Sequence, residues 1–108
     1  MVTETHPRHL FERVVKLLKG GARDEAESLC REAVRQDPSD INFIALLGTI
    51  LADINKLEEA EELLARAVKA APGHARAHED LGAVLLNLGR PDEALGHLQK
   101  AAELTPNN

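Results

Sequence analysis

Two histidines spaced four residues apart are the first residues whose types and spacing could do chemistry. His74 and His78 would share one face of a helix, and two such imidazoles can bind a zinc ion. The segment reads His-Ala-Arg-Ala-His-Glu, however, so no glutamate directly follows the first histidine as it would in a metalloprotease helix. No third ligand is nearby, and His6 and His9 lie close to the start of the chain. We expect a structural or surface role for the pair, with no metal and no cofactor.

The candidate nucleophiles are one cysteine and two serines. A cysteine nucleophile needs an activating base and partial exposure. Cys30 instead stands where Leu64 and Leu98 stand in the repeat described below, which predicts a core residue. Ser28 and Ser39 lack a glycine-framed nucleophile elbow. We therefore expect no enzyme activity, and a single cysteine excludes an internal disulfide.

Composition narrows the class of partner. The 108 residues are 44% apolar and 29% charged, and they include two Phe but no Trp or Tyr. Few aromatic side chains and a formal net charge of −5 disfavour binding to nucleic acid. The apolar stretches are too short to span a membrane, and the start of the chain has no signal peptide. These features predict a cytoplasmic protein that binds neither nucleic acid nor membrane.

Similar residues recur along the chain at one constant interval, which equals the separation of Pro38 and Pro72. This repeat length also relates the residues named above to equivalent positions elsewhere in the chain. The recurring residues are Pro38, Pro72 and Pro106; Ala26, Ala60 and Ala94; Ala33, Ala67 and Ala101; Leu17, Leu51 and Leu85; and Gly48 and Gly82. Such self-similarity is typical of repeat proteins, in which each repeat is one small structural unit.

Each period contains two amphipathic helical patterns separated by a short break. Apolar residues recur at three and four residues in both patterns, and no segment alternates well enough to predict a strand. The breaks fall at Lys19-Gly20-Gly21, at Asn55 and at Gly89-Arg90, and Pro91 suits the first position of a helix. Ser39 or Asp40 is a candidate N-cap. The pattern predicts six helices in three antiparallel pairs.

This helix–turn–helix unit resembles the tetratricopeptide repeat over residues 7–108. The matching pattern is Leu81, Gly82, Leu85, Ala94, Leu98, Ala101 and Pro106 in the third unit and Leu47, Gly48, Leu51, Ala60, Leu64, Ala67 and Pro72 in the second. The resemblance implies an all-α, right-handed solenoid in which Gly48 packs near Ala60 and Gly82 near Ala94. The large aromatic residue usual early in the first helix is replaced by Leu10, Ile44 and His78.

The register divides the chain into a tail and three units. We expect a tail over 1–6 and repeat units over 7–40, 41–74 and 75–108. The first unit departs from the others because His9, Arg13 and Lys16 are polar where both later units are apolar. In a solenoid this face packs on the preceding repeat. A polar face therefore predicts that the first unit is an N-terminal cap.

In the resembled family, the first helix of each unit lines a concave groove that binds a peptide or a partner helix. The residues of this chain that match the family's groove positions are, unit by unit, Arg8, Phe11, Glu12, Val15 and Lys19; Asn42, Ala45, Leu46, Thr49 and Asp53; and Arg76, Glu79, Asp80, Ala83 and Asn87. Phe11, Val15, Leu46 and Ala83 could form an apolar floor, or Phe11 and Leu46 could pack inward between repeats. A protein or peptide partner is the leading hypothesis, with the module acting as a scaffold.

One use of the family groove can be compared residue by residue. Family members that bind chaperone tails grip a C-terminal carboxylate with Lys, Asn and Arg side chains. The matching residues here are Phe11, Val15, Leu46, Arg76 and Asp80. Only Arg76 is basic, and Asp80 would repel a carboxylate, so chaperone-tail binding is disfavoured.

The last predicted helix leaves two alternatives open. It keeps apolar residues, and no polar-faced helix of the kind that usually closes such arrays follows Pro106. We expect either continuation beyond Asn108 or self-association through Leu95, Leu98 and Ala102. Continuation would fit the N-terminal arm of a larger enzyme, such as a sulfotransferase or a glycosyltransferase.

Overall fold

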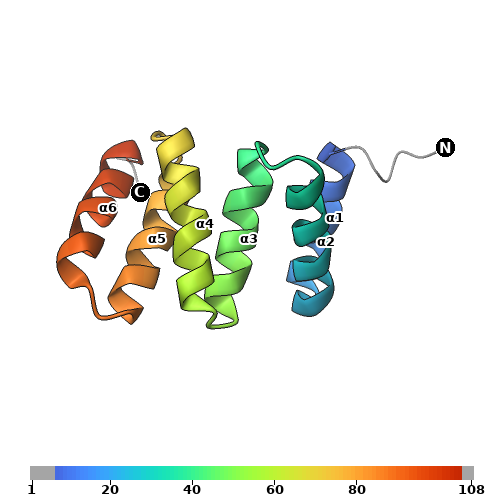
Figure 1. Ribbon diagram of the computed structural model, residues 1–108, viewed down its shortest axis with the longest axis horizontal. Helices are drawn as coiled ribbons and strands as arrows, with labels where there is room; N and C mark the ends of the chain where they lie inside the picture. The colour runs from blue at the N-terminus through green and yellow to red at the C-terminus, as the bar shows by residue number, and fades with distance from the viewer. Residues whose placement is uncertain (1–6, 106–108) are drawn as a thin grey trace.

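The computed structural model describes residues 7–105, which form six helices and no strand. The helices are α1 (Pro7–Lys19), α2 (Arg23–Gln36), α3 (Ile41–Asp53), α4 (Leu57–Ala70), α5 (Ala75–Asn87) and α6 (Pro91–Leu104). They follow one another along a body of 48 × 26 × 25 Å, so that α1 and α2 form one end and α6 the other (Figure 1). The predicted all-α helical-repeat solenoid is confirmed. The expected tail over 1–6 and Pro106 lie outside the described residues.

The turn inside each helix pair uses the same backbone conformation at equivalent positions. Gly21, Asn55 and Gly89 stand one repeat length apart, and each has a positive φ, of 86°, 66° and 79° respectively. Glycine and asparagine tolerate this left-handed conformation best, which explains the breaks in the sequence pattern. Pro91 begins α6 as expected, and the Asp40 side chain caps α3 by accepting a hydrogen bond from the Asn42 N–H.

The core lies between successive helices and is almost entirely apolar. Ile44, Ile50, Leu51 and Leu64 are fully buried in it. Gly48 and Gly82 mark close approaches of the two helices in their units. A Cβ atom on Gly48 would lie 2.7 Å from the Leu64 Cγ atom, and one on Gly82 would lie 2.6 Å from Leu98 Cδ2.

The expected proximity of Gly82 to Ala94 is confirmed, and in both units a leucine comes closer still. Each glycine faces the leucine one turn further along the second helix of its unit, and the Ala94 carbonyl oxygen lies 3.4 Å from the Gly82 Cβ position. The leucine side chains extend back over the preceding turn, as helical side chains do, and so fill the space in front of the glycines.

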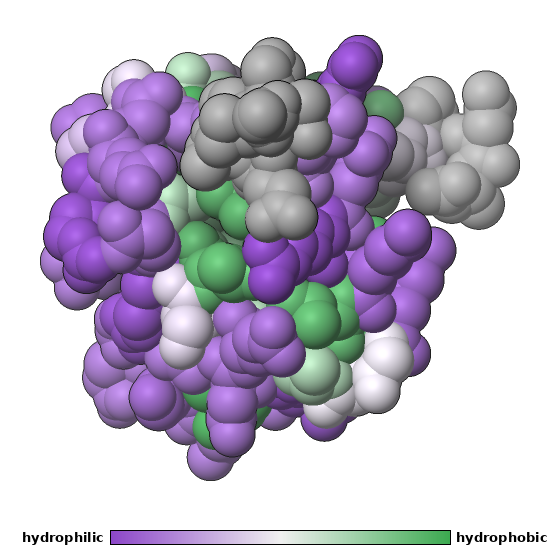
Figure 2. All heavy atoms as spheres, turned by 90° about the vertical axis from the view of Figure 1, so that its right-hand side faces the viewer, coloured by the Kyte–Doolittle hydropathy of each residue, from purple (hydrophilic) through white to green (hydrophobic). Residues whose placement is uncertain are grey.

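The end formed by α1 and α2 is largely polar. His9, Arg13 and Lys16 are not buried, whereas their counterparts in α3, Phe43, Leu47 and Ile50, are buried. Figure 2 shows this end, where hydrophilic residues surround a smaller hydrophobic area near the middle. Within residues 7–105 no helix is long and apolar enough to cross a membrane.

Candidate functional site

A hollow of about 200 Å³ lies where α1, α3 and α5 face the same side of the solenoid. Its lining comprises Phe11, Asn42, Ala45, Leu46, Thr49, His74, Arg76, Ala77 and Asp80. Seven of these nine residues were assigned to the groove from the sequence. The hollow joins residues from three successive units, so the regular stacking of the helix pairs creates it.

The floor of the hollow is apolar and packs on the core. Phe11 packs edge-on against Phe43, with ring centroids 5.6 Å apart, and both Phe11 and Leu46 contact the core while keeping part of their surface exposed. Ala45 and Ala77 are buried. Phe11 and Leu46 thus do both things that the sequence left open: they pack inward between units, and they line the hollow.

The polar wall is a hydrogen-bonded chain that crosses from α3 to α5. The Thr49 hydroxyl lies 2.6 Å from Asp80 Oδ2 and donates to it, and Arg76 Nε lies 3.1 Å from Oδ1 of the same carboxylate. The bonded Asp80 raises the pKa of the Arg76 guanidinium. Asp80 is therefore neutralised, while the two terminal nitrogens of Arg76 make no hydrogen bond or ion pair with the described residues.

The remaining predicted groove residues do not line this hollow. Val15 is half-buried beside it in α1, and Glu79 lines a second hollow between α5 and α6. The others are exposed: Arg8, Glu12, Lys19, Asp53, Ala83 and Asn87. Asp53 and Glu79 act on the Arg76 guanidinium only through their charge. Of the predicted apolar floor, the structure places Phe11 and Leu46 in the hollow, but not Val15 and Ala83.

Sequence reasoning missed His74 and Ala77 as lining residues. His74 is the N-cap of α5, and its Nδ1 atom accepts a hydrogen bond from the Ala77 N–H at 3.2 Å. His74 stands one repeat length after Asp40, the N-cap of α3, but Asp40 does not line the hollow, so the register alone could not identify His74 as a lining residue.

The second histidine of the pair points away from the hollow. His78 is only 7% exposed, and its Nε2 atom lies 2.9 Å from the Pro72 carbonyl oxygen. A carbonyl can only accept, so Nε2 carries the hydrogen and Nδ1 accepts from the Nδ1–H of His97, 3.2 Å away. This arrangement gives His78 the structural role expected from the sequence. Among residues 7–105 no three histidine, cysteine or acidic side chains form a group suited to a metal.

Cys30 is a core residue, as its register position predicted. Its side chain is fully buried, and this burial raises the pKa of the thiol to about 12. A neutral, inaccessible thiol is a poor nucleophile.

Stacked helix pairs with a hollow on the face of their first helices define a helical-repeat binding module. The family model described as "Tetratricopeptide repeat" matches residues 46–108, which is more than half of the sequence. The chain therefore belongs to the tetratricopeptide repeat family. No curated protein matches the chain by sequence.

Solved structures with the same fold include three informative ones. YrrB, described as a tetratricopeptide repeat protein with an unusual peptide-binding site, is 25% identical and superposes with a TM-score of 0.82 over 94% of this chain and 52% of its own. An O-GlcNAc transferase mutant of Thermobaculum terrenum is 28% identical, with a TM-score of 0.89 over 93% of this chain and 19% of its own. MamA (MSR-1) is 27% identical, with a TM-score of 0.82 over 100% of this chain and 62% of its own.

The chain thus spans less than two thirds of each of these proteins. The fold supports an interaction module with protein or peptide partners, as is general for the family.

Proposed function

We propose that the chain is a non-catalytic scaffold module that binds an extended segment of a partner protein along the face of α1, α3 and α5. The observation that carries this proposal is the hollow of about 200 Å³ in which groove residues of three units converge. The peptide-binding site of YrrB, a protein of the same fold, supports the assignment. A cytoplasmic location is part of the same proposal.

The size of the hollow favours a peptide side chain as the occupant. Sites for drug-sized ligands typically measure about 300–1,000 Å³, so this hollow is too small for most of them. An apolar side chain can instead rest on Phe11 and Leu46, where it would leave water. An extended segment can place further residues on the flanking units.

The rim of the hollow supplies hydrogen bonds for the backbone of such a segment. The exposed Asn42 carries both an acceptor and donors, which suit a peptide group. Arg76 adds the unpaired end of its guanidinium, which Asp80 orients by binding Nε. Because Asp80 neutralises Arg76, this single cation does not suit the binding of a terminal carboxylate. We therefore propose that chaperone tails are poor ligands.

The proposal can be tested with a phage-displayed library of random twelve-residue peptides selected on the immobilised chain. Selected peptides are then titrated against Leu46→Ser and Asn42→Ala, with Lys69→Ala on the exposed side of α4 as the matched control. We expect about five- to thirtyfold weaker binding for both groove variants and no change for the control, since a lost apolar contact or hydrogen bond costs about 1–2 kcal/mol. Thermal unfolding verifies that the variants are folded. Equal affinity in all four proteins would refute the groove assignment.

We also propose that the chain is the N-terminal arm of a larger protein that is an enzyme. The similarity to part of an O-GlcNAc transferase favours it, because that protein combines this fold with a longer chain. Mass spectrometry of the native protein from its source tests the idea. A mass well above 11.8 kDa is expected, and a mass equal to it would refute the proposal.

A further inference from the structure

The one side-chain hydrogen bond between α5 and α6 among residues 7–105 joins two histidines, His78 and His97. Their Nδ1 atoms lie 3.2 Å apart, whereas the ring centroids are 5.4 Å apart. The two Nδ1 atoms therefore face each other, as an N–H···N hydrogen bond requires. His78 is buried and His97 is half-buried. The pair thus links the two helices of the third unit at a place largely withdrawn from water.

The corresponding positions of the other two units hold apolar residues. They are Leu10 and Leu29 in the first unit and Ile44 and Leu63 in the second. Ile44 and Leu63 are buried, and Leu10 and Leu29 pack against the core. Histidine, in contrast, can change its charge between about pH 5 and pH 8. Of the three units, the third therefore places a titratable pair at this point of its helix packing.

The hydrogen bonds of His78 fix which nitrogens carry hydrogen. Its Nε2 atom donates to the Pro72 carbonyl oxygen at 2.9 Å, so its Nδ1 atom accepts and His97 donates from Nδ1. The pair can hold one added proton and keep the bond, because a single hydrogen still lies between the two Nδ1 atoms. A second proton would place hydrogens on both Nδ1 atoms, and the bond could not form.

The surroundings of the pair oppose the first added proton as well. The carboxylate whose charge acts on His97 is Glu93, one turn earlier on α6, but Arg90 already binds both of its oxygens, at 2.8 and 2.7 Å. The other ionisable residues one turn from the pair are His74 on α5 and Lys100 on α6, and neither supplies a negative charge. The residues that α3 and α4 bury are apolar or glycine. A positive charge here is thus poorly compensated, and burial lowers the pKa of His97 accordingly.

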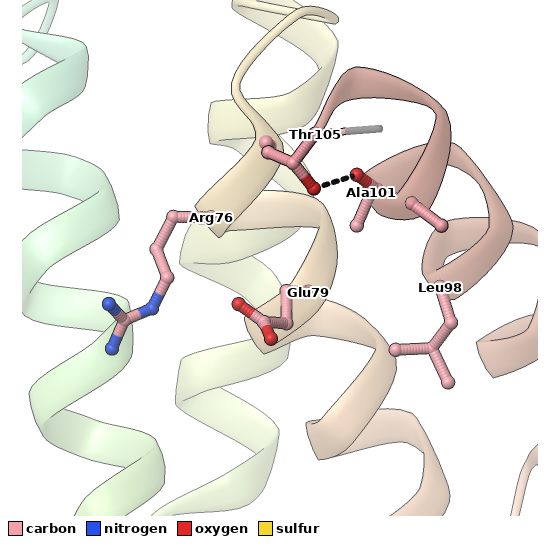
Figure 3. A pocket seen from close by; sticks show the side chains of 7 residues that line it. Arg76, Glu79, Leu98, Ala101 and Thr105 are labelled. Carbon is pink, nitrogen blue, oxygen red and sulfur yellow. Dashed lines mark hydrogen bonds between the residues drawn. The ribbon is translucent and has the colours of Figure 1, made fainter. Parts of the chain in front are cut away.

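Apart from this bond, α6 is held on α5 by apolar packing. Ala94 and Ala101 are the buried residues of α6, and Leu98 packs closely over Gly82. At the end of α6 the Thr105 hydroxyl donates to the Ala101 carbonyl oxygen at 2.9 Å, and Figure 3 shows that this bond stays on α6 itself. The histidine pair therefore supplies the directional contact between the two helices.

The same pair also reaches the start of α5. Pro72, whose carbonyl oxygen His78 binds, lies in the turn between α4 and α5. Two residues further on, His74 caps α5 by accepting a hydrogen bond from the Ala77 N–H, and both of these residues line the groove hollow. Displacement of the His78 ring would therefore disturb the turn that presents His74 and Ala77 to the hollow.

We propose that the His78–His97 pair is a proton-sensitive latch of the third unit. At neutral pH it ties α6 and the α4–α5 turn to α5, and in mild acid both are held more loosely. The contact lies inside one helix pair and does not involve whatever packs beyond α6. Weaker peptide binding in acid is the consequence for the groove, and that part alone rests on the proposed function.

The test variant combines His78→Ile with His97→Leu and so gives the third unit the residues that the second unit has at these positions. It keeps His74, so the effect of that cap on pH dependence is shared by both proteins. Amide hydrogen exchange of the whole chain is followed at about pH 7.5 and about pH 5.5, which bracket the ordinary titration of histidine. Rates are corrected for the intrinsic effect of pH. The Ala101 amide reports on α6, and the Leu47 amide in α3 is the internal control.

We expect the protection of Ala101 relative to Leu47 to fall about two- to tenfold in acid in the unmodified chain, as the loss of one hydrogen bond predicts. The ratio should stay constant in the variant. Equal falls in both proteins, or a fall in neither, would overturn the inference. Imidazole nitrogen NMR of the unmodified chain at neutral pH is a second readout, which holds even if the variant does not fold. We expect the hydrogen of His97 on Nδ1, and finding it on Nε2 would overturn the latch.

The consequence for the groove is tested with the highest-affinity phage-selected peptide at the same two pH values. Neither histidine of the pair lines the hollow, so the variant should keep the affinity measured at neutral pH. We expect the unmodified chain to lose about two- to tenfold more affinity in acid than the variant does. Equal losses would overturn the link between latch and groove. If Leu46→Ser leaves the neutral-pH affinity unchanged, the proposed function fails, while hydrogen exchange still decides the latch.

Discussion

Replacing Gly48 by alanine tests the close approach of α3 and α4. A Cβ atom at this position would lie 2.7 Å from Leu64 Cγ and 2.9 Å from Leu64 Cδ2, well inside the 3.4–4 Å of ordinary contact. Leu64 is fully buried and enclosed by the core, so it has little room to move aside. Helices α3 and α4 would have to separate or Leu64 would have to leave its preferred rotamer.

The magnitude follows from two opposing effects. Overpacking a core costs about 1–3 kcal/mol. Alanine in place of glycine inside a helix returns about 1 kcal/mol. The net loss in the free energy of unfolding for Gly48→Ala is therefore up to about 2 kcal/mol, measured by urea unfolding followed by circular dichroism.

Gly96 in α6 provides the matched control, because a Cβ atom there meets nothing within 4 Å. Gly96→Ala should stabilise the chain by about 1 kcal/mol. Gly82→Ala should fall between the two, since Leu98 is only half-buried at the open end and can shift. Equal stabilisation by Gly48→Ala and Gly96→Ala would refute the close approach of α3 and α4.

Three further predictions concern single side chains. Burial, together with the neighbouring His78, lowers the pKa of His97 below its ordinary 6.5. The contribution of His97 to the free energy of unfolding is therefore fully present above about pH 6.5 and is lost as the pH drops through the lowered pKa. A His97→Gln variant with the same pH dependence of urea unfolding would count against this. Cys30, with its pKa raised to about 12, should react with a thiol reagent at pH 8 far more slowly in the native chain than in urea; similar rates would contradict its burial. Asp40→Ala should cost about 1 kcal/mol through the lost cap on Asn42 N–H, and Asp40→Asn much less; equal losses in urea unfolding would argue against capping.

The fold could be predicted from the sequence because local signals and the register agree. Breaks at Gly21, Asn55 and Gly89 need a left-handed residue, and a helix that begins at Pro91 needs no N–H there. These requirements are local, so the residue types reveal them. The same periodicity identified Cys30 as a core residue.

The details of the site depend on distances between units, which the residue types do not encode. Val15 and Ala83 share the groove side with Phe11 and Leu46, yet the stacking of the units leaves them outside the hollow. The contacts of Asp80 likewise depend on the stacking of the units: it forms an ion pair with Arg76 in its own helix and accepts a hydrogen bond from Thr49 in the preceding unit.

The most direct test of the central claim, that the α1–α3–α5 face binds an extended peptide segment, is to map the bound surface. Amide chemical shifts of the isotopically labelled chain would be recorded during titration with the highest-affinity phage-selected peptide. We predict the largest shifts at Asn42, Leu46, Thr49 and Asp80, with little change at Lys69 on the exposed side of α4. Shifts concentrated on α4, or on Leu95 and Ala102 alone, would contradict the assignment of this face as the peptide-binding surface.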